Sequence, residues 1–239
     1  MKEFIHENIK FIHGDCMDIM AETPDNYYDL CICDPPYGLG LKFIDNGVHG
    51  HKQRNKRGNK KYNSLHNTSK DWNNNIPLPE YFKELHRISI HQIIWGVNYY
   101  AKYIPAVGRI VHDKQMGIEG TKINFSHADI ASCSMQNRVT IFRYRWSGNK
   151  QGESINWNNT GDDARIHPTQ KPIALYKWLL KNYAKEKDRI IDTHLGSGSS
   201  AIAAWEYKCK EFIGIEIDKE YYDAAIKRFK NHVAQKKLF

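Results

Sequence analysis

The sequence has no long apolar run, few cysteines and no clustered metal ligands, and each absence removes a class of protein. No apolar stretch reaches the roughly 18 residues of a membrane span, and residues 1–6 lack the apolar core of a signal peptide. The five cysteines form no Cys-x-x-Cys pair, and the twelve histidines show no metal-ligand spacing. We therefore expect a cytoplasmic protein with no membrane association, no bound metal and reduced cysteines.

The remaining composition is that of one folded domain with a basic surface. A chain of 239 residues, 41% of them hydrophobic, is long enough for one well-covered core. The formal net charge is +8, and positive residues are concentrated in residues 42–75, where the only acids are Asp45 and Asp71. A solvated linker has a similar composition, but the charge favours a mobile loop that contacts nucleic-acid phosphates. The residues expected to make these contacts are Lys52, Arg54, Lys56, Arg57, Lys60 and Lys61.

Apolar runs alternate with amphipathic helical patterns along the chain. Strands are expected over residues 10–13, 28–33, 92–97, 109–112, 139–144, 189–191 and 212–217. Helices are expected between them, from after Asp15 to about residue 21, over residues 81–88 and 172–183, in the Ala-rich segment after Ser200 and from about residue 219. This alternation predicts an α/β fold with a mostly parallel sheet. Polar segments over residues 113–138 and 145–166 are dotted with aromatic residues, and Arg143 and Arg145 are further candidates for nucleic-acid contact.

The motif Asp34-Pro35-Pro36-Tyr37 directly follows the predicted strand 28–33. Two prolines cannot continue a sheet, so the strand must end there. The motif therefore presents an acceptor carboxylate, the carbonyl of Pro35 and the flat ring of Tyr37 together at a strand end. These groups suit a planar base that carries an NH2 group, with two acceptors for its hydrogens and one ring for stacking. A plain turn after a buried strand is the alternative interpretation.

A glycine-rich unit over residues 189–216 predicts a nucleoside site. It runs from a strand through Gly196-x-Gly198 into a helix and a second strand that ends at Glu216. Glycines let a ligand approach the backbone closely, and an acid at this position can accept hydrogen bonds from both ribose hydroxyls. A dinucleotide-binding oxidoreductase has the same pattern, and a glycine loop can also serve only a tight turn. Since ligands of open α/β sheets bind at the carboxyl ends of strands, we expect both loops to border one cavity if their strands are neighbours.

Taken together, these motifs resemble those of the DNA amino-methyltransferases, which transfer a methyl group from S-adenosylmethionine to adenine N6 or cytosine N4. Asp34-Pro35-Pro36-Tyr37 is similar to the catalytic motif of that family. The segments 14–15, 167–172, 192–198 and 214–218 are similar to its cofactor segments. The catalytic motif comes first in the chain, which is the circularly permuted order of the beta group. The order of elements is most similar to the small enzymes of phages and prophages.

The resemblance implies a role for individual residues. The implied catalytic residues are Asp34, Pro35, Pro36 and Tyr37. The residues implied to contact S-adenosylmethionine are Asp15, His167, Thr169, Lys171, Asp192, His194, Gly196, Ser197, Gly198 and Glu216. Much of the wider family has Phe where His194 stands, and the phage-like branch has Thr-His. We favour a histidine packed beside the site over a catalytic base at this position.

The resemblance also implies a single Rossmann-like methyltransferase domain, 1–239, with helices on both faces of its sheet, a basic loop at 42–75 and a target-recognition insertion at 113–166. The expected reaction is site-specific methylation of adenine N6, on a base flipped out of double-stranded DNA in a bacterial or phage-infected cell. The alternatives, in order, are cytosine N4, an RNA or protein-glutamine substrate, a silent nucleic-acid-binding module and a dinucleotide oxidoreductase. A homodimer and a cognate restriction endonuclease stay open.

Overall fold

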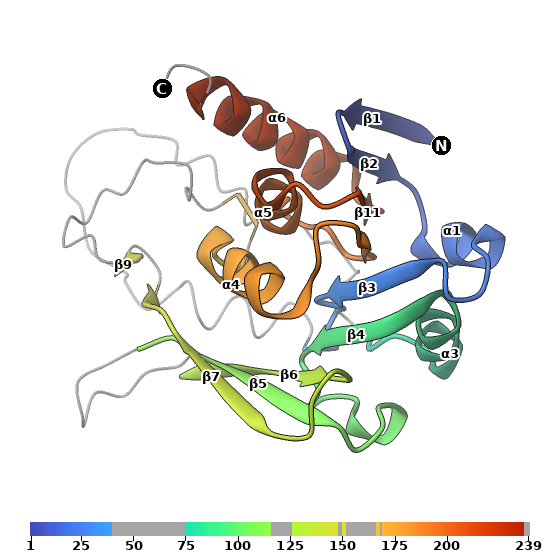
Figure 1. The fold of residues 1–239 in the computed structure, drawn as a ribbon, viewed down its shortest axis with the longest axis vertical. Helices are drawn as coiled ribbons and strands as arrows, with labels where there is room; N and C mark the ends of the chain where they lie inside the picture. Colours follow the sequence, from blue (N-terminus) through green and yellow to red (C-terminus); the bar gives the residue numbers. More distant parts are fainter. Residues whose placement is uncertain (40–74, 116–125, 148–149, 152–165, 168, 237–239) are drawn as a thin grey trace, which may run out of the picture.

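The computed structural model describes residues 1–39, 75–115, 126–147, 150–151, 166–167 and 169–236. These residues form a nine-stranded sheet with helices on both faces (Figure 1). The strands of the sheet are β1 (Lys2–His6), β2 (Ile9–His13), β3 (Tyr28–Cys33), β4 (Ser89–Trp95), β5 (Gly108–Asp113), β6 (Ala128–Cys133), β7 (Val139–Arg143), β10 (Arg189–Asp192) and β11 (Glu211–Glu216). A separate pair is made by β8 (Trp146–Ser147) and β9 (Lys150–Gln151).

Five α-helices and one short 3-10 helix are found among the described residues. They are α1 (Cys16–Glu22), α3 (Pro79–Ile88), η2 (Ala101–Tyr103), α4 (Ile173–Tyr183), α5 (Ser199–Tyr207) and α6 (Lys219–Lys236). Helix α3 illustrates how the sequence builds them: Pro79 stands in the first turn, where a missing N–H costs nothing. Tyr81, Phe82, Leu85 and Ile88 then recur at helical spacing and are all buried.

The strand order is β1-β2-β11-β10-β3-β4-β6-β5-β7. Every pair from β2 to β4 is parallel, whereas β1 runs antiparallel to β2, and β6 runs antiparallel to both of its neighbours. Strand β10 lies between β11 and β3, with Ile190 opposite both Phe212 and Leu30. The carboxyl ends of β2, β11, β10 and β3 therefore lie side by side. The predicted α/β fold with a mostly parallel sheet is confirmed.

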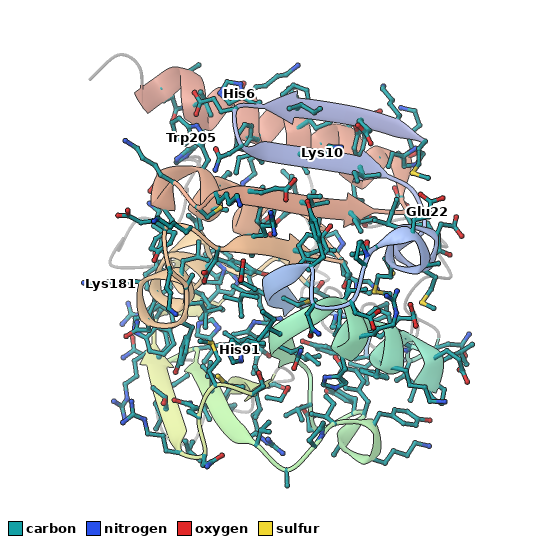
Figure 2. All side chains as sticks on the ribbon, turned by 45° about the vertical axis from the view of Figure 1, so that its right-hand side comes forward. His6, Lys10, Glu22, His91, Lys181 and Trp205 are labelled. Carbon is teal, nitrogen blue, oxygen red and sulfur yellow. The ribbon has the colours of Figure 1, made fainter. Side chains whose placement is uncertain are left out.

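Alternate residues of each central strand face two different helical layers. Ile190 packs in the cluster that includes α4, α5 and α6, whereas its neighbour Ile191 packs in the cluster that includes α1 and α3. Both faces of the parallel strands are covered, which is why these strands read as continuous apolar runs. Lys181 of α4 and Glu22 of α1 are exposed on the outside of these layers (Figure 2).

Two strands of the sheet were not predicted. Strand β1 is at the edge and mostly exposed, so it has the polar composition Lys-Glu-Phe-Ile-His. Strand β6 has the sequence Ala-Asp-Ile-Ala-Ser-Cys, whose small residues give no apolar run, although it lies inside the sheet. Because β6 and β7 both belong to the main sheet, these parts of residues 113–166 are integral to the fold.

The predicted nucleic-acid contacts fall mainly outside the described residues. This applies to Lys52, Arg54, Lys56, Arg57, Lys60 and Lys61, all within residues 40–74. Arg143 and Arg145 are described, and both are exposed. Arg143 Nε lies 3.5 Å from Asp113 Oδ2, and the Arg143 side chain is still mostly exposed to solvent.

The five cysteines are free, with Cys16 half-buried and the others buried. Across the described ranges, no helix combines the length and the apolar character that a bilayer crossing requires. Nor do three or more His, Cys, Asp or Glu side chains of the described residues come together as a metal site.

Gly96, directly after β4, shapes the turn against which the Tyr37 ring packs. Its φ is +79°, a conformation that L residues with a side chain rarely adopt. A Cβ atom at this position would lie 2.2 Å from Tyr37 Cε1 and 2.6 Å from the Tyr100 hydroxyl. The bare glycine therefore allows the Tyr37 ring to lie directly on the backbone.

We expect Gly96→Ala to lower the free energy of unfolding by roughly 1–3 kcal/mol, because it adds both backbone strain and a clash with Tyr37. Urea denaturation measures this difference. Gly14→Ala is the matched control, since its Cβ would meet only Met1 side-chain atoms at 3.4 Å and 4.0 Å. Equal stability of the two variants would contradict this account of the turn.

Candidate active site

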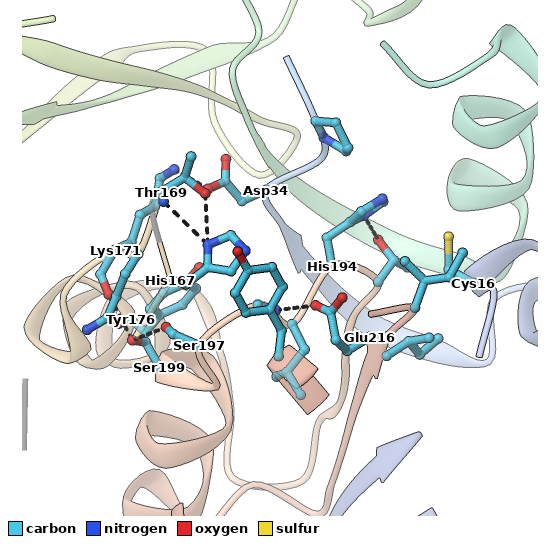
Figure 3. Close-up of a pocket in the computed structure, with 18 of the residues that line it drawn as sticks. Cys16, Asp34, His167, Thr169, Lys171, Tyr176, His194, Ser197, Ser199 and Glu216 are labelled. Carbon is cyan, nitrogen blue, oxygen red and sulfur yellow. Dashed lines mark hydrogen bonds and ion pairs between the residues drawn. The ribbon is translucent and has the colours of Figure 1, made fainter. Parts of the chain in front are cut away.

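A cavity of about 260 Å³ lies at the carboxyl ends of four of the parallel strands, β2, β11, β10 and β3 (Figure 3). The loops after β2, β3, β10 and β11 contribute residues 14–16, Asp34, residues 193–197 and Glu216 to its lining. Residues 169–171, which precede α4, close another side. The Asp34 loop and the turn at Gly196-Ser197-Gly198 (the glycine turn) therefore border one cavity, as expected for loops that follow neighbouring parallel strands.

Glu216 holds the glycine turn in place through its carboxylate. Oε2 accepts a hydrogen bond from Gly196 N at 2.8 Å, and Oε1 accepts one from Asp218 N at 2.8 Å. Burial raises the pKa of Glu216 to about 7. Each carboxylate oxygen keeps a further lone pair, so the group can still accept hydrogen bonds from a diol in the cavity.

The glycine turn is shaped from behind by Asp192. This carboxylate accepts hydrogen bonds from Ser200 Oγ at 2.6 Å and from His194 N at 3.0 Å. Burial raises its pKa to about 7. Asp192 is only 1% exposed and does not line the cavity, and neither does Gly198, which caps α5 with a φ of +75°. Both residues were predicted to contact a cofactor, and the structure places them behind Gly196 and Ser197, which do line the cavity.

His194 lines the cavity with a fixed, uncharged ring. Its Nδ1 lies 3.0 Å from Thr193 Oγ1 and 3.4 Å from the Tyr81 hydroxyl. Burial lowers its pKa to about 4, so the ring is neutral near pH 7 and a weak base. This environment agrees with a histidine held in place beside the site.

Three other predicted cofactor contacts also line the cavity. His167 Nδ1 lies 3.1 Å from Thr169 Oγ1, and its ring meets Tyr221 edge-on at 4.3 Å between centroids. Asp15 stands at the rim, where its Oδ1 accepts a hydrogen bond from Met17 N at 2.9 Å and caps α1.

The motif Asp34-Pro35-Pro36-Tyr37 presents its carboxylate to the cavity. Asp34 Oδ1 accepts a hydrogen bond from the Tyr37 hydroxyl at 2.5 Å. Burial, and then the charge of Asp34, raises the pKa of Tyr37 well above its usual value, so the phenol stays protonated. The Tyr37 ring also stacks on Tyr99 at 4.7 Å between centroids. Pro36 lines the cavity, whereas Pro35 is buried.

Lys171 lies beside Asp34 in the structure. Its ammonium donates a hydrogen bond to Asp34 Oδ2 and lies 3.1 Å from the Tyr37 hydroxyl. The two side chains of this ion pair are only 4% and 12% exposed. Lys171 was predicted to contact the cofactor, and nothing in the sequence indicated its contact with Asp34.

Several further residues support or line the site, although their sequence pattern did not predict it. Tyr81 of α3 was assigned only to the buried face of a helix, yet its hydroxyl lies 2.7 Å from Thr193 Oγ1. Cys16, Tyr176 and Tyr221 line the cavity as well. Nothing in their spacing could have signalled this, because each appears as an ordinary core residue of its own helix.

Comparisons with known proteins agree with this geometry. A family model described as DNA methylase matches residues 113–227. The type II methyltransferase M2.MboI of Moraxella bovis is 23% identical over 248 residues, covering 93% of this chain and 88% of that protein. These matches support an N6/N4 DNA methyltransferase family member.

Solved structures related to this family share the fold. A crystal structure of an M1.HpyAVI–SAM complex superposes with a TM-score of 0.56 at 19% identity, covering 92% of this chain and 99% of that chain. The PvuII DNA methyltransferase, which is cytosine-N4-specific, superposes with a TM-score of 0.59 at 12% identity, covering 93% and 86%.

The buried Asp192 carboxyl predicts a pH-dependent stability. Its pKa of about 7 exceeds the ordinary value of 3.8, so between these values the folded protein keeps a proton that the unfolded chain has released. The free energy of unfolding should therefore fall as pH rises from about 4 to about 7.

We expect Asp192→Asn to remove roughly 2–4 kcal/mol of that fall. Urea denaturation at several pH values measures it, with the exposed Asp18→Asn as the control. Parallel stability–pH curves for Asp192→Asn and the unmodified protein would show that Asp192 ionises normally.

Proposed function

We propose that this protein transfers a methyl group from S-adenosylmethionine to adenine N6 in double-stranded DNA. One observation carries the proposal: Asp34 and Glu216 line the same cavity, although their motifs lie near opposite ends of the chain. An acidic acceptor for an amine and an acidic acceptor for a ribose then face one space. A dinucleotide oxidoreductase has no evident use for the first of these groups.

The residues that line the cavity fit this cofactor. The Glu216 carboxylate, already fixed by two backbone N–H groups, would accept hydrogen bonds from the ribose hydroxyls. Gly196 has a φ of +53° and no side chain, so a ligand can approach the backbone closely there. His167 and Thr169 would contact the methionine end, and Asp15 the adenine end.

Asp34 and the carbonyl of Pro35 would accept the two hydrogens of the target amine. In a base this nitrogen lone pair is delocalised into the ring, and two such acceptors free it for attack. The acceptors gain strength as positive charge builds on the nitrogen, so they stabilise the transition state more than the ground state. Bound S-adenosylmethionine supplies a methyl group that its positively charged sulfur already activates.

A base stacked inside a duplex cannot reach this cavity, so it would flip out at a cost of about a few kcal/mol. Tyr37 would then stack on the flipped base in exchange for its present contact with Tyr99. We assign phosphate contacts to the basic residues of 52–61 and to the exposed Arg143 and Arg145.

Adenine is our first choice of base because the motif begins with aspartate. The second candidate is cytosine N4, which the likeness to the cytosine-N4-specific PvuII enzyme supports. Incubation with duplex DNA and S-adenosylmethionine, followed by mass spectrometry of the released nucleosides, distinguishes N6-methyladenine from N4-methylcytosine. Long-read sequencing of DNA from expressing cells then gives the sequence context. An RNA or protein substrate would show as methylation of those polymers with no modified base in DNA.

We expect Asp34→Asn to lower the rate of methyl transfer by roughly a hundredfold or more, because the amide accepts the amine hydrogens weakly and carries no negative charge. Binding of S-adenosylmethionine, measured by calorimetry, should stay within about twofold of the unmodified protein. Loss of cofactor binding to the same degree would mean that Asp34 supports the fold instead.

Glu216→Gln should show the opposite pattern, with cofactor affinity about 10–100-fold weaker. In the unmodified protein the affinity should also rise as pH increases through about 7, because hydroxyl donors prefer the ionised carboxylate. The glutamine variant should lose this pH dependence, whereas Glu220→Gln, on the exposed first turn of α6, should keep it. Identical pH profiles for all three proteins would contradict the ribose assignment.

A further inference from the structure

Lys171 connects the two halves of the active site. Its backbone carbonyl accepts a hydrogen bond from Ser199 Oγ at 2.8 Å, which ties it to the start of α5. The same serine hydroxyl accepts a hydrogen bond from Arg228 Nη1 at 2.9 Å. The backbone of Lys171 is therefore anchored beside the glycine turn, while its side chain reaches the catalytic motif (Figure 3).

The ammonium of Lys171 has an environment built around Asp34. It donates to Asp34 Oδ2, lies 3.1 Å from the Tyr37 hydroxyl and faces the Trp95 ring at 5.2 Å from its centroid. Both members of the pair are nearly enclosed, so water screens their attraction little. An unpaired carboxylate in such a place would be strongly destabilised.

The positive charge of Lys171 also acts on a second acid, Asp129. Burial alone would raise the pKa of Asp129 on β6, but Lys171 and Lys114 lower it below its ordinary value. Asp129 has its own partner, because Lys114 Nζ lies 2.8 Å from its Oδ1. Lys171 is thus the cation in direct contact with Asp34, while Lys114 neutralises the neighbouring acid.

The two oxygens of Asp34 are each held by one donor. The Tyr37 hydroxyl holds Oδ1 and the Lys171 ammonium holds Oδ2, so the carboxylate has a fixed orientation at the cavity wall. Each oxygen retains lone-pair capacity for an incoming amine. Orientation of this kind matters because a misplacement of about 1 Å can cost roughly a hundredfold in rate.

We propose that Lys171 is a positioning residue for methyl transfer, whose ammonium holds the Asp34 carboxylate in a fixed orientation toward the cavity. This inference rests on the proposed function. It replaces the predicted role of Lys171 as a cofactor contact, and the two roles have different kinetic consequences. A positioning residue governs the rate at saturating cofactor, whereas a cofactor contact governs affinity.

The test compares Lys171→Met and Lys171→Arg in the full chain. We expect Lys171→Met to lower kcat by roughly a hundredfold, with the KM for DNA and the affinity for S-adenosylmethionine each within about threefold. Lys171→Arg keeps the positive charge and should recover at least tenfold of that loss. Lys177→Met is the matched control, because Lys177 of α4 is partly exposed and pairs with Glu206 of α5, away from the cavity, and it should leave kcat unchanged.

Three results would overturn the inference. They are an unchanged kcat for Lys171→Met, a loss of cofactor affinity like that of Glu216→Gln at normal kcat, and a folded Lys171→Arg no more active than Lys171→Met. Failure of the proposed function is distinct, since the unmodified protein would then methylate no DNA at all.

A second variant covers the case in which Lys171→Met does not fold because Asp34 is left unpaired. The double variant Asp34→Asn with Lys171→Met removes both charges and should fold. It should bind S-adenosylmethionine within about threefold of the unmodified protein. Weak binding by this folded double variant would assign Lys171 to the cofactor.

Discussion

The parallel pairing of β10 with β3 is the constraint on which the site depends. Ile190 lies opposite Leu30, and Ile191 lies opposite Cys31, so the two strands end at the same edge of the sheet. The chain that leaves β3 forms the Asp34–Tyr37 motif, and the chain that leaves β10 forms the glycine turn. A shift of one residue in this register would turn the buried side chains to the opposite faces and separate the two loops.

Most of the fold was predictable because its central strands are buried on both faces. Such strands appear in the sequence as short apolar runs, and 28–33 and 189–191 were located almost to the residue. Strand β6 was not predicted because its residues are mostly small or polar and give no apolar run. It is a strand because it pairs with two neighbouring strands. Propensity is local, whereas the pairing that makes β6 a strand is not.

The site was predictable as far as each motif carries its own chemistry. Asp34 and Glu216 could be found because an acid at the end of a buried strand has few structural uses. The partner of Asp34 could not, since Lys171 reaches it across the cavity from a segment far along the chain. Asp192 looked like a ligand contact for the same reason that Glu216 did, but both are buried and only Glu216 lines the cavity.

The pairing of β11 with β2 has a consequence for biosynthesis. Ile9 lies opposite Phe212, so the inner edge of β2 stays unpaired until a strand far along the chain has been synthesised. Contacts of such long sequence separation form late and slowly. The cofactor cavity, which needs Glu216 at the end of β11, cannot exist on a nascent chain that stops short of that strand. The cavity can therefore bind a ligand only after β11 has been synthesised.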